Sequence, residues 1–283
     1  MAPLYLISIT IAISFQNIIK KPYAKRTSGK GAYYFSLITS FSAMLFFIFT
    51  SKDFIFDSGL IIYAILFGIS YAAATLFSVM AVAQGPLSLT TLIIAYSLML
   101  PTFYGLIFLK DPITVGFIPG LALLVISLIL INKKSTDSPP ITVKWIKSVV
   151  LSFLGNGMCS VFQKAQQVKF DGAYKNEFMI FALIFVCIIL GFFVILKERK
   201  EIKFFAKAGT HLALFCGIAN GITNLFVMIL SGLIPVSLMF PLISAGGIIV
   251  TYVVSKVFFK ENLTKAQFIG FILGIASVVF LSI

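Results

Sequence analysis

The chain has 283 residues, of which 60% are hydrophobic and only 11% are charged, and its mean hydropathy is +1.08. This composition excludes the soluble globular classes and predicts an integral protein of the lipid bilayer. The net charge of +13 is explained by lysines that flank membrane spans, so nucleic acid is not expected as a partner.

Apolar stretches long enough to cross a membrane follow one another along the chain. A helix needs about 20 residues to cross the hydrocarbon core, and backbone groups that face lipid must bond within their own segment. The stretches are therefore expected to be helices, and none shows the alternation of membrane barrel strands. The ten predicted spans are about 2–19, 31–50, 59–84, 87–109, 114–132, 145–166, 176–196, 209–233, 235–259 and 265–283.

The last two spans repeat the plan of two spans in the middle of the chain. Pro86 to Ile131 and Pro235 to Ile283 each consist of an apolar span, a charged turn and a second apolar span. The order of elements carries more weight than single identities in so apolar a chain. Residues that match in order are Gly68 with Gly217, Leu76-Phe77 with Leu225-Phe226, Ser88 with Ser237, Gly120 with Gly270 and Ser127 with Ser277.

Residues 132–143, rich in Lys, Ser, Asp and Pro, separate two sets of five spans. The predicted repeats are residues 1–134 and 135–283. Because each repeat has an odd number of spans, the second must enter the membrane from the opposite side. The expected fold is thus an all-α polytopic membrane protein of ten transmembrane helices, arranged as two inverted five-helix repeats.

The two charged turns, Lys110-Asp111-Pro112-Ile113-Thr114 and Lys260-Glu261-Asn262-Leu263-Thr264, add a resemblance. With the ten-span layout they are similar to the EamA-like members of the drug/metabolite transporter superfamily. There each half ends with an acidic turn, then Leu-Thr or similar, then a span that contains glycine. The second turn fits this pattern, and the first departs from it with Asp111-Pro112-Ile113. The resemblance implies an integral membrane carrier of small molecules.

Inverted repeats suit alternating access, in which two halves rock about a site near the midplane. The expected function is secondary transport of a small-molecule substrate, a polar or amphipathic metabolite. The alternative is a non-transporting membrane sensor or assembly partner. An enzyme is not expected, because His211 is the single histidine and the three cysteines lack metal-ligand spacing. No catalytic residue, metal or cofactor is therefore predicted.

Polar residues inside the spans are the candidate substrate contacts. Amides, hydroxyls and tyrosines can hydrogen-bond a solute, although they also hold membrane helices together. All nine acidic residues lie in or beside connections, which disfavours proton coupling through a buried carboxylate. Lys164 is either a cation facing an anionic solute or a side chain that snorkels to the interface. The substrate-binding set is Gln16, Asn17, Tyr71, Tyr96, Gln163, Asn220 and Asn224.

Glycine and proline predict how the spans pack and bend. Small residues four apart let helices approach closely, so spans five and ten are expected to pack against each other or against a second protomer in a homodimer. Prolines and paired glycines are candidate hinges. The packing residues are Gly116, Gly120, Gly270 and Gly274, and the hinge residues are Pro101, Pro241, Gly246 and Gly247.

Basic residues gather at 20–30, at 197–207, around the central seam and around the last turn. These regions share one side of a ten-span layout, and the positive-inside rule places that side in the cytoplasm and both termini outside. Carriers of the family that the chain resembles usually keep both termini inside, so both orientations stay open. Abundant Ile, Lys and Phe are typical of an AT-rich bacterial genome and favour the cell (cytoplasmic) membrane.

Overall fold

The structure is a computed structural model that describes residues 2–51, 54–84, 90, 93–94, 96–131, 142–258 and 265–281. Every regular element in these ranges is helical. In the first half the helices are α1 (Ala2–Arg26), α2 (Ala32–Thr50), α3 (Leu60–Gln84), α5 (Met99–Phe108) and α6 (Phe117–Ile131). In the second half they are α7 (Val143–Lys169), α8 (Lys175–Phe193), α9 (Ile202–Ser231), α10 (Val236–Phe258) and α11 (Lys265–Leu281).

Helix ends follow from local chemistry. Thr142 caps α7, because its hydroxyl accepts a hydrogen bond of 3.2 Å from the Trp145 backbone N–H, one of the donors that the first turn leaves free. Gly31 separates α1 from α2 with φ of 75°, a left-handed conformation that glycine adopts at low cost. Between α8 and α9 the chain turns through a π segment, Val194–Glu198, and a 3-10 segment, Arg199–Glu201.

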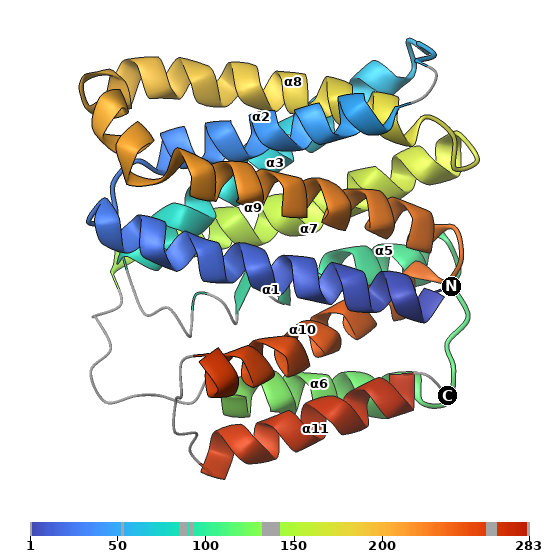
Figure 1. The fold of residues 1–283 in the computed structure, drawn as a ribbon. Helices are drawn as coiled ribbons and strands as arrows, with labels where there is room; N and C mark the ends of the chain where they lie inside the picture. The colour runs from blue at the N-terminus through green and yellow to red at the C-terminus, as the bar shows by residue number, and fades with distance from the viewer. Residues whose placement is uncertain are drawn as a thin grey trace.

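Several of these helices are long and apolar enough to cross a membrane, as judged by length and composition. They are Ala2–Lys20, Ala32–Thr50, Leu60–Ala81, Val143–Lys169 and Lys175–Ser231. The last stretch contains both α8 and α9, which run antiparallel in Figure 1. The predicted class of a helical, multi-pass membrane protein is confirmed at this level, whereas ten crossings stay a prediction.

The remaining apolar helices are shorter. They are Met99–Phe108, Phe117–Leu130, Val236–Gly247 and Phe268–Leu281. In the described part of the span predicted at 87–109, the structure has the ten-residue α5, and residues 90, 93–94 and 96 before it are helical as well. The span predicted at 209–233 matches the part of α9 that follows Gly209, where the backbone departs from helical geometry (φ 176°, ψ 38°) and the helix kinks. The part of α9 before this kink, from Ile202, carries the basic residues Lys203 and Lys207.

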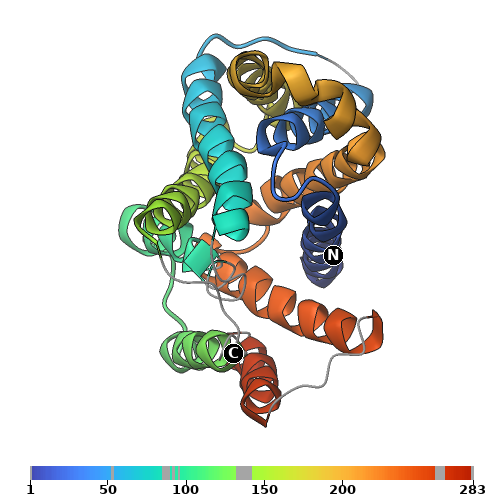
Figure 2. The ribbon, with the colours of Figure 1, turned by 90° about the vertical axis from the view of Figure 1, so that its left-hand side faces the viewer.

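Successive helices alternate in direction and lie roughly side by side (Figure 1). The view in Figure 2 shows α6, α10 and α11 grouped beside a larger bundle. Within the bundle, α3 packs against α7 and α8, α9 packs against α1 and α2, and α2 packs against α8. Helix α10 packs against α1, α5 and α11, and α6 packs against α11.

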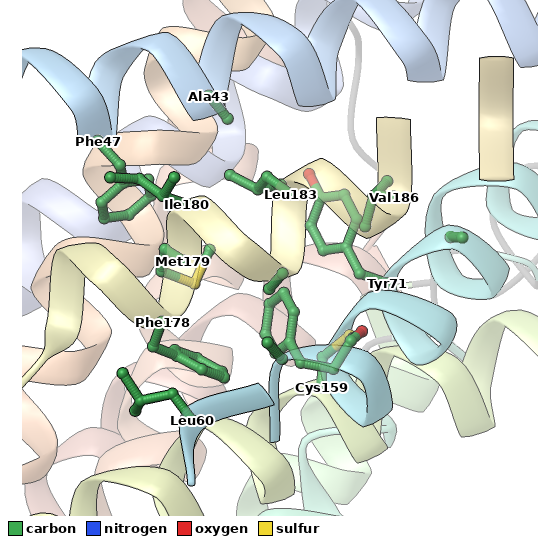
Figure 3. Close-up of a cluster of buried hydrophobic side chains, with 14 of the residues drawn as sticks. Ala43, Phe47, Leu60, Tyr71, Cys159, Phe178, Met179, Ile180, Leu183 and Val186 are labelled. Carbon is green, nitrogen blue, oxygen red and sulfur yellow. The ribbon is translucent and has the colours of Figure 1, made fainter. Parts of the chain in front are cut away.

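The largest apolar core lies between α2, α3 and α8, where Phe47, Leu60, Phe178 and Leu183 are fully buried (Figure 3). The outer surface is also apolar: Phe49 is 83% exposed and Val115 is 94% exposed. Large exposed hydrophobic side chains are unfavourable in water and suit contact with lipid tails.

The α1–α2 and α8–α9 connections lie next to each other. The Arg26 guanidinium donates to the Ala208 carbonyl at 3.0 Å, and the Lys30 ammonium lies 3.9 Å from the Glu201 carboxylate. Two of the basic regions singled out in the sequence therefore share one end of the molecule.

Candidate functional site

A chain of neutral polar side chains links α1, α3 and α9. The Tyr71 hydroxyl donates to Oδ1 of Asn220 at 2.9 Å, and Nδ2 of Asn220 donates to Oε1 of Gln16 at 3.2 Å. The Gln16 amide in turn donates to the Thr223 hydroxyl at 3.2 Å. Each of these side chains thus finds a hydrogen-bond partner on a neighbouring helix, as polar groups removed from water require.

The same chain of hydrogen bonds extends to α7. Nδ2 of Asn224 donates to the Asn220 carbonyl at 3.0 Å and to its Oδ1 at 2.9 Å. Nε2 of Gln163 donates to the Asn224 carbonyl at 3.2 Å. We call these six residues the polar network: Gln16, Tyr71, Gln163, Asn220, Thr223 and Asn224.

Helix α9 can present these polar groups because its residues segregate by face. Asn220 and Asn224 are four apart, so they lie on one side of the helix. Gly217 and Gly221 are also four apart and meet α2, where an added Cβ would collide with Ser42 and with Phe46, respectively. Close packing on the glycine face fixes α9 and aims its amides at α1, α3 and α7.

The polar network consists of uncharged side chains that are largely shielded from solvent. Gln16, Tyr71 and Gln163 are buried, whereas Asn220, Thr223 and Asn224 are half-buried. Amides and hydroxyls both donate and accept hydrogen bonds, so they can exchange partners with a polar solute. The arrangement offers hydrogen bonding and supplies no charge of its own.

The structure brings most, but not all, of the predicted substrate contacts together. Tyr96 stands apart: its hydroxyl donates to the Val125 carbonyl of α6 at 3.1 Å, and its ring packs beside Leu124 and Leu128. The side chain of Asn17 lies outside the described residues. Thr223 was missed because hydroxyls are common in spans, although its spacing of three from Asn220 was a usable signal.

Lys164 follows Gln163 on α7 and points to a different partner. Its ammonium donates to the Ser231 carbonyl, the last residue of α9, at 2.7 Å, and the side chain is half-buried. The carbonyls at a helix C-terminus attract cations because they have no partner within the helix. Lys164 is therefore held at the end of α9 and not by the polar network.

The predicted hinge residues occupy different surroundings. Pro101 stands in the first turn of α5, where proline is tolerated, whereas Pro241 lies inside α10. An added Cβ at Gly246 would lie 2.7 Å from Cγ2 of Thr10, so close packing on α1 accounts for glycine there. At Gly247 an added Cβ would meet nothing within 4 Å.

The predicted packing residues lie where α6 meets α11. An added Cβ at Gly116 would collide with the backbone carbonyl of Phe280, and one at Gly120 would lie 2.8 Å from Cγ of Leu281. On α11, Gly270 and Gly274 are buried. The two backbones therefore approach so closely that side chains larger than hydrogen do not fit at Gly116.

Two serines bridge these helices in a reciprocal way. The Ser127 hydroxyl of α6 donates to the Gly270 carbonyl at 2.6 Å, and the Ser277 hydroxyl of α11 donates to the Gly120 carbonyl at 2.9 Å. In the sequence, Ser127 matches Ser277 and Gly120 matches Gly270. Residues that match in the sequence thus exchange matching hydrogen bonds.

Groups for metal binding are not assembled in the part of the chain that the structure describes. No set of three or more His, Cys, Asp or Glu side chains is placed there to hold a metal ion. Cys159 and Cys216 are free and buried, and Cys187 is free and half-buried.

Comparison with known proteins yields a fold and no family. No protein-family model matches the sequence, and no curated protein matches it. Among solved structures, 29 chains match. One of them, a protein crystal structure, has a TM-score of 0.75 and 13% sequence identity, and the match covers 99% of this chain and 98% of that chain. At this identity the likeness establishes the arrangement of helices alone.

Proposed function

We propose that the chain is a secondary transporter that carries small polar or amphipathic metabolites by alternating access. The observation that carries the proposal is the polar network, which joins helices of both halves of the chain. Tyr71 and Asn220 lie near the middle of α3 and α9, and carriers bind solute near the midplane between their repeats.

The packing of helices supports two inverted halves, residues 1–134 and 135–283. If α1, α2, α3, α5 and α6 are exchanged with α7, α8, α9, α10 and α11 in that order, most packed pairs turn into other packed pairs. The α3–α7 pair becomes α9–α1, α3–α8 becomes α9–α2, and α5–α7 becomes α10–α1, while α2–α8, α5–α10 and α6–α11 return to themselves. Helix α10 also packs on α11 and on α6, and among the described residues the shorter α5 has no comparably packed partner in α6 or α11. An approximate two-fold axis explains this pattern.

Single residues support the same axis. Tyr71 and Asn220 are separated by the offset that relates Leu76 to Leu225, and they are hydrogen-bonded to each other. Residues that are equivalent in two repeats can touch only near the axis that relates them. The Tyr71–Asn220 bond therefore marks the centre of the proposed transport path.

The proposal includes a family and a location. Two halves that each end in an acidic turn and a glycine-containing helix are the reason to propose an EamA-like member of the drug/metabolite transporter superfamily. The turn at Lys260 to Thr264 lies outside the described residues, and the turn at Lys110 to Thr114 lies within them. We propose the cytoplasmic membrane as the location.

Ligand-induced stabilisation tests this function. The detergent-purified protein is heated with amino acids, sugars, nucleosides, organic anions or cationic drugs, and the midpoint of unfolding is measured. A solute that binds only the folded state at 100 times its Kd adds about 2.7 kcal/mol of stability. We expect one chemical class to raise the midpoint, and we expect Gln16→Ala and Gln163→Ala to remove the rise.

Gln166→Ala is the matched control for that experiment. Gln166 is a buried amide on α7, three residues from Gln163, but it donates to the Ala173 carbonyl outside the polar network. This variant should keep the ligand-induced rise. A rise that survives Gln16→Ala and Gln163→Ala would place binding elsewhere. If no solute raises the midpoint of a monodisperse sample at millimolar concentration, a sensor or assembly partner becomes the better proposal.

A further inference from the structure

An acidic residue of the first half is bound to the start of a helix of the second half. Asp111 lies in the connection between α5 and α6, and its Oδ2 accepts a hydrogen bond of 2.9 Å from the Ser237 backbone N–H. The backbone at Asp111 is held in place locally, because the Asp111 N–H donates to the Gly105 carbonyl at 3.1 Å. An added Cβ at Gly105 would lie 2.6 Å from Oδ2 of Asp111 and 3.0 Å from the Ser237 nitrogen. The contact therefore depends on glycine at 105.

The partners of this carboxylate are electropositive and belong to the second half. Ser237 is in the first turn of α10, where free N–H groups and the helix dipole favour a negative charge. Lys164 of α7 adds a positive charge to this end of the second half, because its ammonium binds the carbonyl of Ser231, six residues before Ser237. In Figure 1 the α5–α6 and α9–α10 connections meet at the same end of the molecule.

The start of α10 has two features that make a second arrangement accessible. Pro241 has no N–H, so it leaves the Ser237 carbonyl without the usual donor four residues later. The Ser237 side chain is 0% exposed, and its hydroxyl has no hydrogen-bond partner. A buried polar group without a partner is unfavourable, and access of water would relieve that cost. Ser237 thus lacks one carbonyl hydrogen bond within its own helix and is bound to Asp111 through its backbone N–H.

We propose that Asp111 is a latch between the two halves. It holds the α5–α6 connection against the start of α10 and keeps that end of the molecule closed, and its release from Ser237 opens that end with a bend at Pro241. This inference rests on the alternating-access carrier proposed above and names the contact that one of its two states must break. Glu261, the sequence counterpart of Asp111, lies outside the described residues.

Distances between spin labels on the two halves test the latch. Ile107 on α5 is 65% exposed and Leu233 before α10 is 55% exposed, so both positions tolerate a label. The labels are attached to Ile107→Cys and Leu233→Cys after the three native cysteines are replaced by alanine. Without any solute, Asp111→Ala should raise the population of molecules with the longer label distance, relative to those with the shorter one, roughly tenfold. This is the size expected for the loss of one charge-assisted hydrogen bond. Asp111→Asn keeps an acceptor oxygen and should give a smaller rise.

Asp57→Ala is the matched control. The Asp57 carboxylate also accepts a backbone hydrogen bond, at 2.7 Å, but from Gly59 in its own connection. This variant should leave the distances unchanged. The latch is overturned if Asp111→Ala leaves them unchanged or if Asp57→Ala changes them equally, and Asp111→Asn decides the question if Asp111→Ala does not fold. The distance measurement uses no solute. Unchanged label distances in Asp111→Ala would therefore reject the latch even if a solute raises the unfolding midpoint. The lack of any solute that raises the midpoint would instead count against the carrier and leave the label distances to decide the latch.

Discussion

The core between α2, α3 and α8 and the contact between α6 and α11 show two ways of joining helices. In the first, large side chains fill the space: the Phe67 and Phe178 rings meet edge to face with centroids 5.4 Å apart. In the second, glycines remove side chains, and serines bond to the exposed backbone of the facing helix. The first contact depends on volume and the second depends on backbone distance.

The difference follows from the interactions that can stabilise helix association in a membrane. Lipid tails are as apolar as leucine, so association of helices relies on dispersion, close packing and hydrogen bonds. Aromatic side chains supply many dispersion contacts across a wide gap. Small residues reach a comparable result by bringing two backbones together. Substitutions should therefore affect the two regions in opposite ways: loss of volume harms the core, and gain of volume harms the α6–α11 contact.

The largest effect is expected in the core. Phe178 is fully buried, so Phe178→Ala should leave a cavity and lower the free energy of unfolding by about 3–5 kcal/mol. Chemical unfolding of the purified protein in detergent measures the change. Phe49→Ala removes the same atoms from a highly exposed position on α2 and should change stability by less than about 0.5 kcal/mol. Equal losses in both variants would contradict a core held together by volume.

A smaller loss is expected when a methyl group is added between α6 and α11. Gly116→Ala would place a Cβ against the Phe280 carbonyl, which cannot move without shifting α11. Overpacking of this kind costs about 1–3 kcal/mol. Gly191→Ala adds the same methyl group to α8, where nothing lies within 4 Å, and should raise stability by up to about 1 kcal/mol. Thermal unfolding would reject the backbone-contact interpretation if both variants behaved alike.

The smallest effect tests the approximate two-fold axis. Ser127→Ala and Ser277→Ala each remove one reciprocal hydrogen bond and should each cost about 0.5–1.5 kcal/mol. If the serines are equivalent in two inverted halves, as proposed, the two losses should be similar. Ser8→Ala removes a hydroxyl that bonds at 2.9 Å to Leu4 in its own helix and should cost less. A loss confined to one of the two bridging serines would argue against equivalence.

The sequence was informative wherever the determining property is local. Apolar length predicted helices, and paired residues predicted equivalence between Ser127 and Ser277, because hydropathy and order along the chain need no knowledge of partners. The amide spacing of Asn220 and Asn224 also predicted a shared face of α9. Apolar length and amide spacing depend on residues within a few turns of one another, and the match of Ser127 with Ser277 needs only the order of residues along the chain.

Partners between distant helices were decided by tertiary packing alone. Tyr96 reads like Tyr71 in the sequence, yet Tyr96 bonds to α6 while Tyr71 joins the polar network. Asp111 looked like a charge in a connection, and its partner, Ser237, is 126 positions away. Side-chain hydrogen bonds reach only about 3 Å, so small shifts in helix position choose among similar polar groups. The sequence by itself therefore determined the helical membrane class and the candidate residues, while the tertiary structure decided which of them meet.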